Sequence, residues 1–204
     1  MRAPDFFAEV PALTLHDPLA ELLGAAEGGI VEYRYIDAVR LAGHSCPTVA
    51  AAWNMTRRAL VALHPDSLPQ RGGIRAEFRD ERRASVTGVI AAVVTLLTGA
   101  TQDDGFKGLG GRFDRRNLLG FSVDIDGDIR FTRVDTGAAV DVAARLQSVP
   151  FAPGTPALLE KCLAGTASAA EAGDFRAAWQ GRVRALLLAH GDDPEVFPLR
   201  PVAA

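Results

Sequence analysis

The stretch that decides the fold is residues 46–63, CPTVAAAWNMTRRALVAL. Pro47 suits the first position of a helix, because its φ is already helical and its missing N–H is not needed there, and Cys46 then falls at the N-cap. Side chains that suit a buried face recur at intervals of three and four residues, as in an amphipathic helix. They are Val49, Ala52, Trp53, Thr56, Ala59, Leu60 and Leu63. The sequence therefore predicts a helix over 47–63 that ends before Pro65 and packs on a core.

Shorter elements are predicted on both sides of this helix. Asp17-Pro18 is typical of a helix start, with Asp as the N-cap and Pro in the first turn. Residues 30–35 and 74–78 alternate in the manner of strands. Residues 86–97 are almost wholly apolar, which predicts a buried helix.

The rest of the chain predicts a hairpin followed by helices. Residues 118–125 and 128–134 have strand character, and Asp126-Gly127 between them is typical of a two-residue turn in which both positions need φ > 0. We interpret 138–190 as helical and 194–204 as an irregular tail.

This order of elements predicts an α+β fold in which helices cover a mixed β-sheet. The predicted units are an α+β domain over residues 1–137, which carries the candidate site, and a helical C-terminal extension over 138–204.

The composition bounds the class of protein. A chain of 204 residues, 48% hydrophobic and 23% charged, can bury a core of ordinary size. Its net charge of −3 gives no electrostatic reason to expect a nucleic acid or a membrane as partner. The longest apolar run, 89–97, is far shorter than the ~20 residues that span a bilayer. With no apolar signal segment and two cysteines, we expect a cytoplasmic protein with free thiols.

The segment Gly43-His44-Ser45-Cys46-Pro47 holds the residues with the clearest chemistry. Imidazole and thiolate are preferred ligands of zinc and related metals. A thiolate at a helix N-terminus is also stabilised by the helix dipole and by free N–H groups. The alternative is a structural cysteine beside a hydrogen-bonding histidine, and the spacing alone favours that alternative.

A mononuclear metal site needs three or four protein ligands. His16 is the preferred third ligand, since it lies just before a helix start, although a surface histidine explains it equally well. His64 falls at the far end of the 47–63 helix, ~25 Å away. His190 is interpreted as a cation at a helix C-terminus, and Cys162 as a core residue.

Two further side chains are candidates for the chemistry of the site. Lys107 lies in the Gly-rich loop 105–112 and is one of two lysines in an arginine-rich chain. The loop amides, with Lys107 and Arg112, suit an anion, and a flexible crossover is the alternative. Asp37 lies close enough in sequence to orient His44. No GxSxG, HExxH or phosphate-loop motif is present.

Residues 41–53, LAGHSCPTVAAAW, resemble the signature of the FmdE-like family, which takes its name from a component of formylmethanofuran dehydrogenase. That signature is close to H-G-H-x-C-P-G-L-A followed by a helix. The family continues with a buried helix that runs into T-G-C-T and then a Gly-Lys-Gly stretch. Residues 86–101 and 106–108 look similar in the same order. The resemblance covers about residues 15–135.

Several family positions differ here. Ala42 replaces the first histidine of the signature, so His16 is expected to take its place, and Ala100 replaces the cysteine of T-G-C-T. Residues 102–105 are additional, and the later cysteine pairs of some members are missing. The resemblance implies an α+β fold, binding of zinc or a similar ion, and frequent dimers. It does not imply that this chain processes formylmethanofuran.

We therefore expect a metal-binding protein in which His16, His44 and Cys46 hold zinc or another divalent transition metal. An open coordination position would bind a small ligand or substrate, with Lys107 supplying positive charge near it.

Two alternatives remain open. The chain can be a non-catalytic accessory or metal-delivery partner of a redox enzyme that docks through 138–204. It can also be a metal-free thiol enzyme with Cys46 as nucleophile and His44 as base. In either case we expect a homodimer, because the Phe6-Phe7 segment and the C-terminal helices carry more apolar surface than the core needs.

Overall fold

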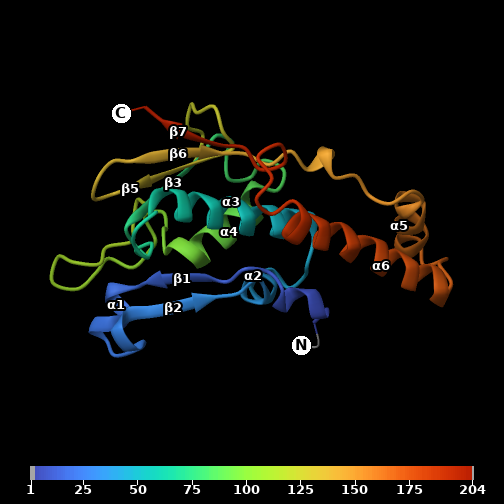
Figure 1. Ribbon diagram of the computed structural model, residues 1–204, viewed down its shortest axis with the longest axis horizontal. Coiled ribbons are helices and arrows are strands. Elements are labelled where there is room, and N and C mark those ends of the chain that lie inside the picture. The colour runs from blue at the N-terminus through green and yellow to red at the C-terminus, as the bar shows by residue number, and fades with distance from the viewer. Residues whose placement is uncertain (1–2, 204) are drawn as a thin grey trace.

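A mixed five-stranded sheet forms one layer of the protein. The computed structural model describes residues 3–203 and confirms a mixed sheet flanked by helices (Figure 1). Only β3 and β4 pair in parallel, and every other neighbouring pair is antiparallel. The strands, in their order across the sheet, are β4 (Leu119–Gly120), β3 (Ile74–Phe78), β5 (Ile129–Arg133), β6 (Ala139–Val142) and β7 (Leu199–Val202).

Helices separate this sheet from an antiparallel ribbon. The ribbon consists of β1 (Leu13–His16) and β2 (Ile30–Tyr33), and the helices α3 and α4 lie between it and the sheet (Figure 1). The helices are α1 (Pro18–Leu22), α2 (Tyr35–Ala42), α3 (Pro47–Leu63), α4 (Thr87–Thr98), α5 (Thr155–Leu163) and α6 (Ala169–Arg184). Short turns are η1 (Asp5–Ala8), η2 (Glu27–Gly29), η3 (Leu146–Ser148) and the π-helical η4 (Ala185–Ala189).

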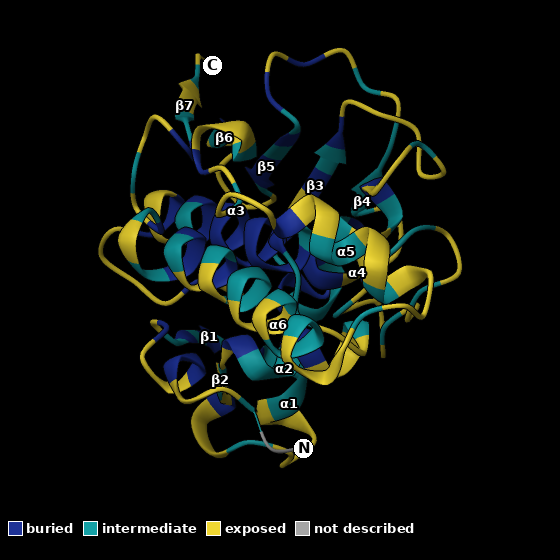
Figure 2. Ribbon diagram, turned by 90° about the vertical axis from the view of Figure 1, so that its right-hand side faces the viewer, coloured by how far each residue is buried: buried dark blue, intermediate teal, exposed yellow. Residues whose placement is uncertain are grey.

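The central helix α3 is the one predicted from the sequence. It spans Pro47–Leu63, and Cys46 at its N-cap has the extended conformation expected there, with φ −148° and ψ 169°. Most of its side chains are buried, as the dark ribbon in Figure 2 shows. Trp53 has no exposed surface. Burial on nearly every face follows from its place between the sheet and the ribbon.

Three other predicted elements are confirmed. Strands β2 and β3 form within 30–35 and at 74–78, and α4 covers 87–98. Asp17 caps α1 as predicted, since its carboxylate accepts hydrogen bonds from the N–H groups of Leu19 and Ala20 at 3.0 and 3.1 Å.

The hairpin predicted around Asp126-Gly127 is wrong. Strand β4 pairs with β3, while β5 pairs with β3 and β6, so the segments before and after the dipeptide are not partners. Gly127 is needed for a different reason, namely a close approach of two backbones. A Cβ at this position would lie 2.7 Å from the carbonyl oxygen of Val142.

The C-terminal region is helical only in part. Residues 139–142 and 199–202 form β6 and β7, so the predictions of helix and of an irregular tail at these positions are wrong. The boundary predicted at residue 137 falls between β5 and β6, which are hydrogen-bonded neighbours in one sheet.

The remaining helices, α5 and the first part of α6, extend away from the sheet (Figure 1). The core position predicted for Cys162 is also wrong. Cys162 is half-buried on α5, and its neighbour Leu163 is 79% exposed. Among residues 3–203, no helix is long and apolar enough to cross a membrane.

The aromatic N-terminal segment belongs to the core. The rings of Phe6 and Phe7 meet edge to face with centroids 4.8 Å apart, and Phe7 meets Tyr35 in the same way at 4.9 Å. Both phenylalanines are buried within the chain. This segment therefore exposes no apolar surface of the kind on which the homodimer was predicted, and the homodimer stays a prediction.

His64, at the end of α3, gives the fold a dependence on pH. Its ring is buried, Nδ1 donates to the carbonyl of Leu60 at 3.1 Å, and burial lowers the pKa of the imidazole. A depressed folded-state pKa means that the unfolded chain binds the proton more readily. We expect the contribution of His64 to be complete above pH ~6.5, the unfolded pKa, and to be lost as pH falls towards the folded value. Urea unfolding at several pH values should show a smaller loss in His64→Gln, and an identical loss would contradict this assignment.

Candidate functional site

The loop 43–46 joins α2 to α3, and two residues define its ends. Gly43 adopts the left-handed conformation, with φ 78°, and so closes α2. Pro47 is the first residue of α3. The loop is short because the residue that ends α2 and the residue that begins α3 are only four positions apart.

The far C-terminal helix α6 holds this loop in place. The carbonyl oxygen of Ser45 accepts hydrogen bonds from Nε1 of Trp179 at 3.2 Å and from Nε2 of Gln180 at 3.1 Å. The hydroxyl of Ser45 donates to Oε1 of Gln180 at 3.1 Å. These contacts join segments that are 134 and 135 residues apart in the sequence.

Tyr35 completes the hydrogen bonds of Ser45. Its hydroxyl lies 3.0 Å from Oγ of Ser45, and because that hydroxyl already donates to Gln180, the phenol acts as the donor. Burial raises the pKa of Tyr35 far above its ordinary value, so the phenol keeps its proton. The hydrogen bonds therefore run in one direction, from the Tyr35 hydroxyl to the Ser45 hydroxyl and from that hydroxyl to Oε1 of Gln180.

A mainly apolar pocket of about 240 Å³ lies between this loop and α6. The apolar wall comes from η1, α2 and α6, and the aromatic part of α6 is itself packed. Trp179 stacks on Phe151 with ring centroids 5.1 Å apart and contacts Phe175 at 5.5 Å. The principal lining residues are Phe7, Val39, His44, Phe175, Arg176 and Trp179.

His44 lines this pocket, and one of its ring nitrogens is left without a partner in residues 3–203. Its Nδ1 lies 2.9 Å from the carbonyl oxygen of Ala42, and since a carbonyl only accepts, Nδ1 carries the proton in the neutral ring. Nε2 is then the acceptor, and it has no hydrogen-bond partner among the described residues. This nitrogen can accept a hydrogen bond from a ligand or bind a metal.

Cys46, unlike His44, lies outside the pocket lining. Its side chain is half-buried against the core, and it does not line the pocket. No hydrogen bond joins the thiol to the imidazole, whose Nδ1 is directed at the chain carbonyl. The two side chains of the predicted motif therefore lie in one loop without forming a nucleophile–base pair.

His16 lies at the other end of the β1–β2 ribbon. It pairs with Ile30, whereas α2 follows from Tyr33 at the opposite end of β2. Its Nε2 contacts Oε2 of Glu21 at 2.9 Å. Within residues 3–203, no group of three or more His, Cys, Asp or Glu side chains is placed to hold a metal ion. The three predicted ligands do not form one ligand set in this chain, and the zinc site stays a prediction.

The two predicted catalytic residues have other surroundings. The Asp37 carboxylate accepts from the N–H of Arg34 at 2.9 Å and from Nη1 of Arg40 at 3.1 Å, so it caps α2 and does not contact His44. Lys107 is exposed in the loop before β4 and does not line the pocket. Their predicted roles receive no geometric support.

Sequence reasoning missed Ser45, Tyr35 and the pocket face of α6. Phe175, Arg176, Trp179 and Gln180 follow one another at the spacing of neighbouring turns, which places them on one side of the helix. That spacing was the available signal. What it could not indicate was that this side faces the loop 43–46.

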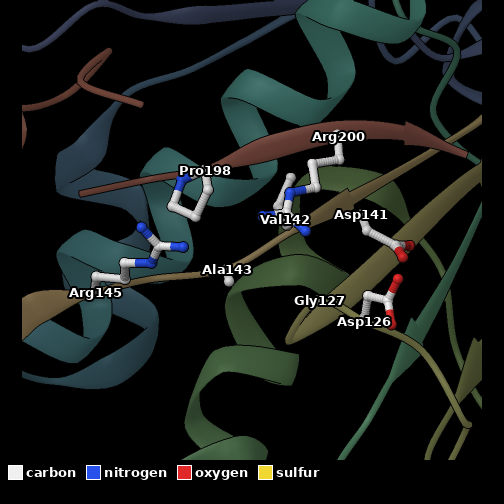
Figure 3. Close-up of a pocket in the computed structure, with 8 residues that line it drawn as sticks. All are labelled: Asp126, Gly127, Asp141, Val142, Ala143, Arg145, Pro198 and Arg200. Carbon is white, nitrogen blue, oxygen red and sulfur yellow. The ribbon is translucent and has the colours of Figure 1, made fainter. Parts of the chain in front are cut away.

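A second, polar cavity of about 140 Å³ lies at β6 and β7. The carboxylates of Asp126 and Asp141 face one another there (Figure 3). Asp141 is already paired with Arg130, whose Nε and Nη2 donate to its two oxygens at 2.7 and 2.8 Å. This cavity contains none of the candidate site residues predicted from the sequence, so we place the candidate site at the loop 43–46.

Comparisons with known proteins add no identification. No known protein family matches the chain, and no curated protein matches it. The resemblance of residues 41–53 to the FmdE-like signature therefore stays a prediction.

Proposed function

We propose that the protein binds a small organic ligand with an aromatic body and an acidic group in the pocket between the loop 43–46 and α6. The observation that carries this proposal is the combination of apolar walls with two convergent polar groups, His44 and Arg176. Ligand sites commonly have this composition, in which apolar walls supply affinity and a few polar groups fix orientation.

Arg176 favours an acidic ligand. Arg176 makes no ion pair with an acidic side chain among the described residues, so its guanidinium is free to form two parallel hydrogen bonds to a carboxylate. The free Nε2 of His44 accepts a hydrogen bond from a hydroxyl or N–H group elsewhere on the ligand. The rings of Phe175 and Trp179 line the pocket and supply aromatic surface against which an aromatic body packs.

The test is a titration with small aromatic carboxylates, monitored by tryptophan fluorescence. The chain has two tryptophans, and Trp53 is fully buried away from the pocket, so a ligand-induced change reports on Trp179. We expect saturable binding to the wild type and about tenfold weaker binding to Arg176→Ala, because a charge-assisted hydrogen bond is lost.

The matched control is Arg184→Ala, which removes the same charge from the same helix. Arg184 is exposed, forms an ion pair with the exposed Glu9, and does not line the pocket. Equal weakening in the two variants, or no saturable binding of any aromatic acid, would contradict the proposal.

Metal binding at His44 and Cys46 is the second proposal. Its support is the orientation of His44, because a carbonyl that fixes Nδ1–H presents Nε2 as a ligand. Metal analysis of the purified protein should show metal in the wild type and less in both His44→Ala and Cys46→Ala. Equal metal content in all three proteins would refute it. The accessory-partner and thiol-enzyme alternatives stay predictions.

A further inference from the structure

Three arginines converge on a cavity of about 400 Å³ that is separate from the proposed ligand pocket. Arg71 comes from the segment before β3, and Arg112 and Arg115 come from the loop before β4. The remaining wall includes the ring of Phe113 and the side chain of Asp114. Lysine is absent from this wall, and the planar guanidinium is the group best suited to bind oxyanions through two donors at once.

Asp17 neutralises only one of the two inner arginines. Its carboxylate accepts from Nη2 of Arg115 at 2.7 and 2.9 Å and from Nη1 of Arg71 at 3.0 Å. Its Oδ1 also accepts from the N–H groups of Leu19 and Ala20. The acceptor positions of Asp17 are therefore filled, and one positive charge remains uncompensated at the inner wall.

Arg115 has donors without acceptors. The residue is 8% exposed, and its Nε is buried with no hydrogen-bond partner. Among the described residues, the hydrogen bonds of its guanidinium all come from Nη2, so Nη1 also remains free to donate. The backbone leaves room for this side chain, since a Cβ at Gly99 would lie 2.7 Å from Nη1 and one at Gly72 would lie 3.5 Å from Nε. Both glycines have positive φ, which other residues rarely adopt.

Arg112 is exposed, but its surroundings fix its position. Its backbone pairs with Leu109 through two hydrogen bonds of 2.9 Å across the Gly110-Gly111 turn. Its guanidinium lies over the ring of Phe113, 4.7 Å from the centroid. Arg112 makes no ion pair with an acidic side chain in residues 3–203, so a second positive charge remains uncompensated.

The charges at the cavity add to an excess of two. Asp114 does not reduce it, because Arg116 outside the cavity already holds that carboxylate at 2.7 Å. Such an excess is notable in a chain whose net charge is −3. It matches a dianion, and the donors of Arg112 and Arg115 suit the several oxygens of a phosphate.

We propose that this cavity binds the phosphate group of a small phosphorylated molecule. The phosphate contacts Arg112 and the free Nη1 of Arg115, while Arg71 supports them through Asp17. The cavity is much larger than a single ion, since a water molecule takes about 30 Å³ of liquid. The extra space and the ring of Phe113 accommodate the organic part of a phosphate monoester.

The test is calorimetric titration of the full chain at low ionic strength, where screening is least. The probes are inorganic phosphate and glycerol phosphate, an ester without the aromatic body that the first pocket takes, with glycerol as the uncharged comparison. We expect saturable binding of both phosphates, tighter for the ester, and none of glycerol. Arg112→Ala should weaken the binding of both about tenfold, because a charge-assisted contact is lost.

Two controls separate this site from general electrostatics and from the first pocket. Arg83→Ala removes the same charge from an exposed residue outside the cavity, and it should bind phosphate as the wild type does. Arg176→Ala should also bind phosphate normally, so failure of one proposal does not imply failure of the other. Equal losses in Arg83→Ala and Arg112→Ala, or the absence of saturable phosphate binding, would overturn the inference and leave Arg71, Asp17 and Arg115 as a purely structural network.

Discussion

Replacing Asp17 with Ala is expected to lower the free energy of unfolding by about 3–5 kcal/mol. Asp17 is 4% exposed, and its carboxylate holds the guanidinium groups of Arg71 and Arg115. Its removal leaves the buried Arg115 and the half-buried Arg71 without this counter-charge and also removes the N-cap of α1. Urea unfolding measures the loss. Asp66→Ala, in which an exposed acid without an ion pair is removed, should change stability very little.

The variant Asp17→Asn distinguishes the contribution of the negative charge from that of the helix N-cap. Asparagine caps a helix about as well as aspartate, so any loss in this variant reports on the ion pairs. Burial opposes ionisation of Asp17, but hydrogen bonds from Arg115, Ala20 and Arg71 outweigh it and lower the pKa of the carboxyl.

A lowered folded-state pKa contributes stability that is complete above the unfolded value of about 3.9 and is lost as pH falls through the folded value. The acid-induced loss should therefore be smaller in Asp17→Asn. An Asn variant as stable as the wild type at pH 7 would contradict a role for the charge.

Replacing Trp53 with Ala is expected to cost about 3–5 kcal/mol, because a cavity forms at the centre of α3. The indole has no exposed surface and meets Tyr35 edge to face at 6.1 Å. Tyr35 in turn donates to Ser45, so the loss of Trp53 should also loosen the loop 43–46.

Trp53→Phe is the matched comparison. It keeps an aromatic ring but removes Nε1, which is buried without a hydrogen-bond partner. A buried donor without an acceptor is unfavourable, so its removal offsets part of the lost packing and the Phe variant should lose much less stability than the Ala variant. Urea unfolding of both variants tests this expectation, and equal losses would contradict it.

The sequence allowed prediction of those elements whose signals are local. Pro47 and the apolar repeat along 47–63 specify α3 without reference to any other segment. Strand β6 could not be found in this way, because the alanine-rich residues around 139–142 favour helix by intrinsic propensity. Pairing with β5 on one side and β7 on the other outweighs that preference.

Strand β7 shows the same limit. Pro201 argues against an interior strand, yet it is tolerated because β7 lies at the edge of the sheet and has one partner only. Asp126-Gly127 led to a wrong prediction of a hairpin, because the glycine of a hairpin turn is also the residue that a close backbone contact requires. Strand β7 and the missing hairpin both depend on which distant strands pair, and a local sequence pattern carries no information about that pairing.

The candidate site was likewise predicted only in its local part. The loop 43–46 was predicted because Gly43 and Pro47 mark the helix ends beside His44 and Cys46. Its contacts with α6 were not predicted, because no periodicity indicates which helix lies against a loop more than 130 residues earlier. The orientation of His44 depends on one backbone carbonyl, which spacing alone does not place.

The contact between Ser45 and α6 also sets an order for biosynthesis. A ribosome that has added Ser45 must add 134 more residues before Trp179 exists. At about 5–20 residues per second, this takes roughly 7–27 seconds. During that time the Ser45 carbonyl lacks both of its α6 donors, and β6 remains an open sheet edge until residues 199–202 are made. The nascent chain is therefore most exposed to misassociation before these two segments emerge, and both the loop and the sheet are completed only when they do.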